Sequence, residues 1–153
     1  MKFDIQPYIG AAPITFGMSR DEAHRILGLP ESSHPIWDGS GISESYNRSG
    51  FNIGFDTSDA VNHLGFGPGG AELTIQGTPI WTPQLQPDPN PLLLRLDPNP
   101  LEVVGFWVFL QIGITTTGYH DGDDGQRAIT VFAQELKQDW LEGAASADTS
   151  KYR

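Results

Sequence analysis

Three aspartates beside two glycines could bind a calcium ion, because calcium is held by carboxylate oxygens at short spacing. These are Asp121, Asp123 and Asp124. An EF-hand loop starting at Asp121 requires glycine at its sixth position and glutamate at its twelfth. Gln126 and Phe132 stand there instead. The calcium pattern is not met, and the glycine and aspartate content predicts a solvated hairpin loop. A partner-binding loop and a weak cation site remain the alternatives.

Other residues with chemical potential do not form a recognisable active site. His24, His34, His63 and His120 lie on different predicted elements, and no two have the i, i+4 spacing of a zinc-protease helix. The chain has no cysteine, which removes disulfides, thiolate nucleophiles and thiolate zinc ligands. It has no Gly-x-Ser-x-Gly elbow, and residues 67–70 lack the lysine of a phosphate loop. We predict no catalytic, cofactor-binding or metal-binding residues, and we predict that the protein is not an enzyme.

The best-defined predicted element is a helix from Arg20 to Leu27. Ser19 and Glu22 form the sequence pattern of a capping box, which satisfies unpaired backbone donors at the start of a helix. Gly28 can adopt the left-handed conformation that closes a helix, and Pro30 cannot continue one. A helix this short is unstable alone, so it must pack against a sheet. The side chains expected to face that sheet are Ala23, Ile26 and Leu27.

Alternating apolar residues predict the sheet. The first half is predicted to be this helix followed by an antiparallel meander of three or four strands. Its strands are Ile42–Tyr46, Phe51–Asp56, Val61–Phe66 and a strand around Leu73 and Ile75.

The second half repeats this plan more loosely. The segment Asn90–Leu96 is predicted either as a short helix or as an extended apolar stretch. The expected strands are Glu102–Gln111, Ile112–Tyr119 and Arg127–Gln134, followed by a short helix over Glu135–Glu142.

The fold class is therefore α+β, an antiparallel sheet with one or two short helices packed on one face. We expect a single domain over residues 1–143, with two tandem helix-plus-meander units, 1–80 and 81–143, as an alternative. Residues 144–153 are expected to be a flexible tail.

The four tryptophans are expected to differ in environment. Trp107 lies in an apolar strand and is predicted to be in the core, and Trp140 is predicted to pack the last helix onto the sheet. Trp37 and Trp81 lie among turn residues and prolines. Aromatic residues are enriched at interface hot spots, so these two are candidate surface anchors, although loop tryptophans also fold back onto small cores.

The segment Ile14–Pro30, together with the Phe51–Asp56 strand and its return at Val61–Leu64, resembles a known group of bacterial proteins. These are the SmpA/OmlA-like, or β-lactamase-inhibitor-like, proteins and the immunity proteins of polymorphic-toxin systems. The resemblance implies a helix-plus-meander scaffold and transfers no site residues. It also implies an immunity protein that binds a cognate toxin domain and occludes its active site. Residues 1–8 show no charged start followed by an apolar run, so we expect the protein to be cytoplasmic.

Charge is consistent with such a partner. The chain has 19 acidic and 9 basic residues, a formal net charge of −10, which argues against binding nucleic-acid phosphates. It favours a basic toxin, although acidic proteins are also simply soluble. No 18-residue apolar span is present, so we predict no membrane partner.

A small-molecule-binding or sensor domain is the alternative function. The candidate partner contacts are Trp37, Asp56, Asp59, Tyr119, Asp121, Asp123 and Asp124.

Overall fold

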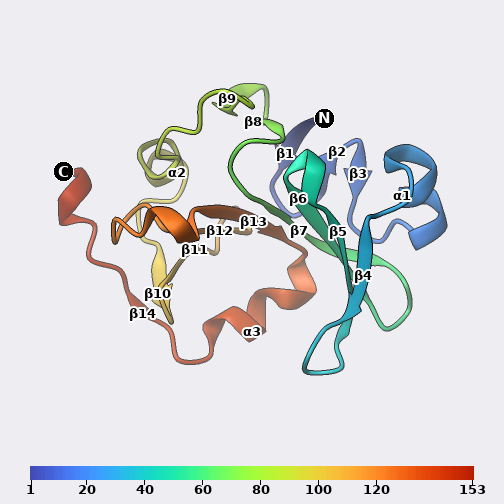
Figure 1. Cartoon of the computed structure of the whole chain (residues 1–153). Coiled ribbons are helices and arrows are strands. Elements are labelled where there is room, and N and C mark those ends of the chain that lie inside the picture. The colour runs from blue at the N-terminus through green and yellow to red at the C-terminus, as the bar shows by residue number, and fades with distance from the viewer.

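The computed structural model describes residues 1–153 and has an α+β fold with two sheets (Figure 1). The large sheet is built from β4 (Ser32–Pro35), β5 (Gly41–Tyr46), β6 (Phe51–Asp56), β7 (Val61–Phe66), β10 (Leu101–Val103), β11 (Phe106–Phe109), β12 (Ile114–Thr117), β13 (Ala128–Phe132) and β14 (Ala145–Ser146). The small sheet is built from β1 (Lys2–Gln6), β2 (Gly10–Ala12), β3 (Ile14–Thr15), β8 (Glu72–Ile75) and β9 (Thr78–Trp81). The α-helices are α1 (Arg20–Leu27), α2 (Asn90–Leu96) and α3 (Lys137–Leu141). None of them has the length and hydrophobicity needed to cross a bilayer.

The large sheet consists of two similar units joined edge to edge. Its strand order is β14-β10-β11-β12-β13-β7-β6-β5-β4, and every pairing in it is antiparallel. Helix α1 precedes the meander β4 to β7, and α2 precedes the meander β10 to β13. The last strands of the two meanders pair, with Leu64 opposite Val131. The fold class and the helix over Asn90–Leu96 are thus confirmed.

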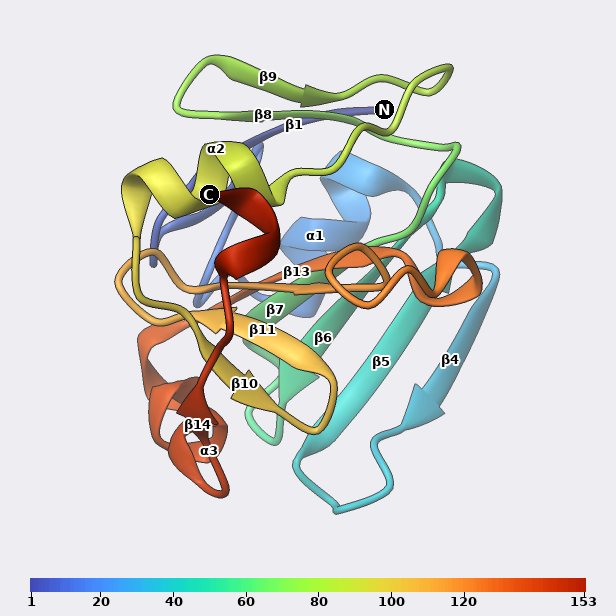
Figure 2. The same cartoon turned by 90° about the vertical axis from the view of Figure 1, so that its left-hand side faces the viewer.

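The core lies between the large sheet and the small sheet. Phe3 and Ile5 of β1 and Leu73 of β8 are fully buried, and they belong to the same apolar cluster as Phe55 and Leu64 of the large sheet. Figure 2 shows the small sheet above the large one, with α1 and α2 between them. Both helices also contribute buried side chains to this cluster. We call the face of the large sheet toward this core the inner face, and the opposite face the outer face.

Helix α1 has the predicted bounds, with Ser19 and Gly28 as its two cap residues, although Gly28 has ψ −175° and so is not in the left-handed helical conformation. Ser19 Oγ accepts a hydrogen bond from the backbone N–H of Glu22 at 3.2 Å, and Gly28 closes the helix at φ 82°. The predicted apolar stripe is wrong at one position, because Ile26 is 44% exposed. Only Ala23 and Leu27 are buried. Residues four apart lie above one another on a helix, so this pair forms a narrow contact strip.

Two predictions about the first meander need correction. The strand containing Leu73 and Ile75 does not continue the meander, because β8 pairs in parallel with β1 in the small sheet. The sequence did not predict strand β4. It comes first in the four-stranded meander and forms one edge of the large sheet. Its residues are polar and end in proline, as is common for edge strands, so they lack the alternation that marks a half-buried strand.

The predicted strand Glu102–Gln111 is instead a hairpin. Val104 and Gly105 both have positive φ, 47° and 85°, and they turn the chain between β10 and β11. Trp107 is buried as predicted, and β11 lies between β10 and β12 in the sheet. Val104 is 93% exposed at the turn. Because valine is apolar and stands in an apolar run, the sequence predicted a continuous strand there and not a turn.

The C-terminal residues predicted as a flexible tail are packed against the rest of the chain. Strand β14 pairs with β10, and the ring of Tyr152 lies 5.5 Å from that of Trp107. The Tyr152 hydroxyl donates a hydrogen bond to Asp88 Oδ2 at 2.5 Å and accepts one from Asn90 Nδ2 at 3.1 Å. Because these partners lie more than 60 residues away in the chain, composition near the terminus could not reveal them.

Replacing Tyr152 with alanine is expected to lower the free energy of unfolding by about 1–2 kcal/mol, through lost aromatic packing and two lost hydrogen bonds. Urea denaturation followed by fluorescence measures this. The control is Arg153→Ala, an exposed change expected to stay within about 0.5 kcal/mol. If the two variants were equally stable, the docking of the C-terminal segment would be refuted.

Candidate functional site

The outer face of the large sheet is covered on one unit and open on the other. Helix α3 lies over the second unit. The ring centroid of Trp140 is 5.2 Å from that of Phe106 and 6.0 Å from that of Phe132. The first unit has no such cover, and its outer face carries Ser43, Asn52 and other half-buried polar side chains. Antiparallel sheets often expose one polar face to water. The boundary between the covered and open halves is where the surface is hollowed.

A groove of about 580 Å³ lies at that boundary, between the tip of the β4–β5 hairpin and α3. Figure 1 shows the hairpin and α3 extending on the same side of the large sheet. The hairpin contributes Ile36, Trp37 and Asp38, the sheet contributes Ser43, His63 and Thr130, and the C-terminal segment contributes Leu136, Asp139 and Trp140. We call it the Trp37–Trp140 groove. It joins two tryptophans, two carboxylates and one imidazole from segments far apart in the sequence.

The hairpin that carries Trp37 has a well-defined backbone. Ile36 N–H donates to Gly41 O at 2.9 Å, and Ser40 N–H donates to Asp38 Oδ1 at 2.9 Å. Hydrogen bonds from the Ser40 hydroxyl and backbone lower the pKa of Asp38, so it is ionised at neutral pH. Trp37 is nonetheless 95% exposed, the most exposed large apolar side chain in the protein. The local hydrogen bonds therefore fix the backbone of the hairpin tip, from which the unburied side chain of Trp37 projects.

His63 forms part of the groove floor and lies flat on the sheet. A Cβ atom at the cross-strand residue Gly54 would lie 1.8 Å from its ring, so glycine there makes room for the imidazole. Its Nδ1 is 2.8 Å from Asn62 Oδ1. An amide oxygen can only accept, so Nδ1 carries the proton and neutral His63 has its lone pair on Nε2. Burial lowers the pKa of His63 from its ordinary 6.5, which favours this neutral form.

This lowered pKa predicts an acid-sensitive contribution to stability. Below pH 6.5 the unfolded chain protonates His63 before the folded protein does, so the contribution is complete above that pH and is lost as the pH falls toward the folded pKa. Between about pH 7 and pH 5, the wild type should therefore lose more unfolding free energy than His63→Gln. Urea denaturation at a series of pH values gives both curves. Parallel curves would contradict the prediction.

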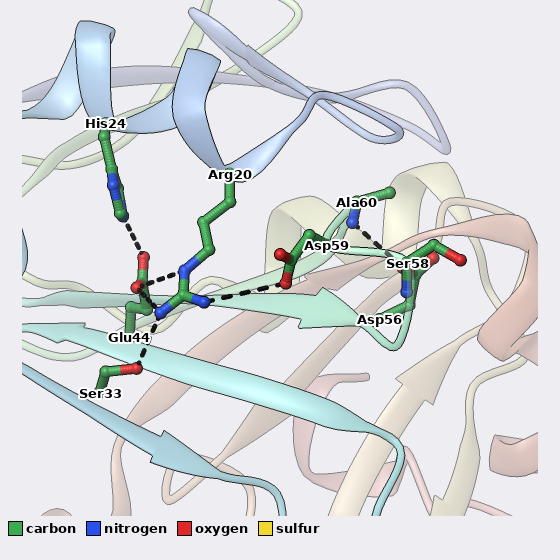
Figure 3. A network of polar contacts seen from close by, with 8 residues as sticks. All are labelled: Arg20, His24, Ser33, Glu44, Asp56, Ser58, Asp59 and Ala60. Carbon is green, nitrogen blue, oxygen red and sulfur yellow. Dashed lines mark hydrogen bonds and ion pairs between the residues drawn. The ribbon is translucent and has the colours of Figure 1, made fainter.

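A second polar cluster anchors the base of this region to α1 (Figure 3). Glu44 of β5 has a side chain with no solvent exposure, and it accepts a hydrogen bond from Arg20 Nε at 2.9 Å. His24 Nε2 lies 2.6 Å from the other Glu44 oxygen. Arg20 also reaches Ser33 of β4 at 3.3 Å. The cluster thus ties the helix to both strands of the hairpin that carries Trp37, and Arg20 also lies 3.8 Å from the carboxylate of Asp59 in the β6–β7 turn.

The predicted partner contacts fall at two opposite ends of the large sheet. Asp56 pairs with Gly41 at the end that carries Trp37, and Asp59 is exposed there. The aspartate loop instead follows the Thr117–Ala128 pair, at the other end. The structure therefore brings together Trp37, Asp56 and Asp59, and it separates them from Tyr119, Asp121, Asp123 and Asp124.

Several of these acidic side chains have internal partners. Asp56 Oδ1 accepts from the N–H groups of Ser58 and Ala60 at 2.8 and 3.1 Å, which fixes the β6–β7 turn. In the distant loop, Asp121 accepts from the N–H of Asp123, and Asp124 pairs with Arg127 at 2.9 Å. Asp123 is exposed.

Two aromatic residues proposed as surface anchors are not available on the surface. Tyr119 is 5% exposed, and its hydroxyl donates to Gln86 O at 3.1 Å. Trp81 is 1% exposed, and its indole N–H donates to Pro87 O at 3.0 Å. The hydroxyl and the indole N–H both donate to backbone carbonyls of the proline-rich segment at residues 83–91, and both rings lie in the interior. Among the proposed aromatic anchors, only Trp37 is exposed.

Sequence reasoning did not connect His63, Asp139 or Trp140 with a site. The sequence predicts no metal-binding role for His63 and only a packing role for Trp140. The adjacent acid and tryptophan at 139–140 mirror Trp37 and Asp38 in composition, which is a signal visible in the sequence. Nothing local shows that these two pairs face one groove.

No group of three or more histidine, aspartate or glutamate side chains is arranged to hold a metal ion. The chain matches no protein-family model, no curated protein and no solved structure.

Proposed function

We propose that this protein is an immunity-type inhibitor that binds a bacterial toxin domain and covers its active site. The observation that carries the proposal is Trp37, 95% exposed on a hairpin whose backbone is fixed by its own hydrogen bonds. A large rigid aromatic side chain held in water is typical of an interface hot spot. The uncovered outer face of β4 to β7 beside it supplies a polar surface for the rest of the contact.

Charge and sequence resemblance support the same proposal. A net charge of −10 attracts a basic partner and speeds its association, while excluding like-charged proteins. The segment from Ile14 to Pro30 resembles immunity proteins of polymorphic-toxin systems. In the structure its helix, α1, holds the hairpin through Arg20 and Glu44. The inhibitor would act by binding alone, without catalysis.

The test is co-expression with the product of the adjacent gene, scored by rescue from toxicity and by co-purification. Trp37→Ala is expected to weaken the complex about 100-fold, in the range of hot-spot truncations. The control is Leu29→Ala, which removes another exposed apolar side chain, 80% exposed, near the opposite end of β4. It should leave affinity unchanged. Absence of both rescue and complex with the wild type would overturn the proposal.

A second candidate is a small-molecule-binding domain, which the Trp37–Trp140 groove favours. Its volume of about 580 Å³ is in the range of ligand sites, and it combines tryptophan walls with a polar floor that could orient a small molecule. A metabolite screen by thermal shift tests it. Two results together would favour this function over the first. A compound raises the Tm of the wild type but not that of Trp140→Ala, and the wild type forms no complex with the toxin.

A further inference from the structure

The two walls of the Trp37–Trp140 groove have the same chemistry. The hairpin wall carries Trp37 next to Asp38, and the α3 wall carries Trp140 next to Asp139. Asp38 and Asp139 are both exposed, and no lysine or arginine lines the groove. Each wall therefore offers an aromatic surface together with a carboxylate.

The arginine that contacts the hairpin and the lysine of α3 have other partners. Arg20 is bound to the buried Glu44, and Lys137 Nζ lies over the ring of Tyr8, 5.6 Å from its centroid. His63 on the groove floor is neutral at pH 7, because burial lowers its pKa, and it adds no positive charge. The carboxylates of the groove are thus not neutralised from within.

An aromatic surface beside a carboxylate is a good environment for a guanidinium group. Arginine stacks on aromatic rings, is more weakly hydrated than lysine, and pairs with carboxylates through two parallel hydrogen bonds. The neutral His63 presents a lone pair on Nε2, and Ser43 and Thr130 supply hydroxyl oxygens on the same floor. All of these groups can accept hydrogen bonds from a donor-only side chain.

We propose that the Trp37–Trp140 groove binds an arginine side chain that projects from the partner protein. The guanidinium stacks against tryptophan, and Asp38 and Asp139 pair with its charge. This inference rests on the proposed function, since it names the chemistry of the partner at the same surface. It explains why the exposed tryptophan and the acidic charge occur together at one end of the sheet.

The probe is N-acetyl-L-arginine methylamide, titrated into the ¹⁵N-labelled full chain. A single side chain of this size is expected to bind with a Kd on the order of a millimolar. The indole N–H signals of Trp37 and Trp140 should shift with saturation, while those of the buried Trp81 and Trp107 serve as internal references. The citrulline analogue has the same shape without charge and should bind at least about tenfold more weakly.

The matched variant is Asp38→Asn with Asp139→Asn, which keeps both side-chain shapes and changes only exposed groups. It should weaken arginine binding at least about tenfold and remove the preference over citrulline. Absence of shifts at Trp37 and Trp140, or equal binding of arginine and citrulline, would overturn the proposal.

The two proposals fail in different ways. Binding of the arginine probe without any toxin complex would refute the immunity function and leave the arginine site standing. A toxin complex of unchanged affinity with the double aspartate variant would refute the arginine site and leave the immunity function standing.

Discussion

Replacing Arg20 with alanine is expected to lower the free energy of unfolding by about 3 kcal/mol. The side chain of Glu44 has no solvent exposure, and removing Arg20 leaves its carboxylate with His24 as the one remaining side-chain partner. A buried carboxylate that loses a hydrogen-bonded cation keeps its desolvation penalty. Arg20 itself is 29% exposed and His24 stays in place, so we expect the lower end of the range known for broken buried pairs.

Urea denaturation at pH 7 measures the effect, and Arg25→Ala is the matched control. Arg25 lies on the same helix, is exposed and makes no ion pair, so its replacement should change stability by less than about 0.5 kcal/mol. Equal stability of the two variants would show that Arg20 does not support the buried carboxylate. Because the cluster also contacts Ser33 of β4, Arg20→Ala should also loosen the hairpin that carries Trp37.

Replacing Gly41 with alanine is expected to cost about 3 kcal/mol or more, through a clash with the backbone. Gly41 has φ 155°, and a Cβ atom there would lie 1.8 Å from the carbonyl oxygen of Phe55 on the paired strand. A backbone atom within a sheet cannot rotate away as a flexible side chain can. The β5–β6 pairing must therefore separate locally at the start of β5, next to the tip of the β4–β5 hairpin.

Gly39→Ala in the same hairpin is the control for this change. Gly39 has φ 78°, but nothing lies within 4 Å of an added Cβ atom. It should cost only about 1–2 kcal/mol, the penalty for a non-glycine residue in the left-handed region. Chemical denaturation gives the free energy of unfolding of both variants. Their difference separates the cost of the backbone clash at residue 41 from the cost of a left-handed non-glycine residue. A Gly41→Ala variant as stable as Gly39→Ala would contradict the geometry of the β5–β6 pair.

The hairpin connects these stability predictions to the proposed function. Its tip carries Trp37, Gly41 begins its second strand next to the tip, and its strands are tied to α1 through Glu44 and Ser33. Changes at Arg20 or Gly41 should therefore weaken partner binding as well as folding. Trp37→Ala should weaken binding alone, because a side chain that is 95% exposed contributes little to the folded core.

The sequence by itself determined the elements whose signals are local. Ser19 and Gly28 set the ends of α1, because a cap depends on a few neighbouring backbone groups. Strict alternation located β6, whose side chains must point in turn to the two faces of the sheet. The acidic balance was also apparent from the sequence, and Trp37 was one of the two tryptophans that the sequence marked as candidate surface anchors.

Only the tertiary structure decided which strands pair and which faces are covered. Leu73 lies in a strand as predicted, but its partner is the N-terminal β1, some 70 residues away. Trp81 and Tyr119 resemble Trp37 in local sequence, yet they are buried because the proline-rich connector accepts their hydrogen bonds. The groove likewise joins residues near 37, 63 and 140. Backbone preferences act over a few residues, whereas burial depends on packing between distant segments, so no local pattern could specify this site.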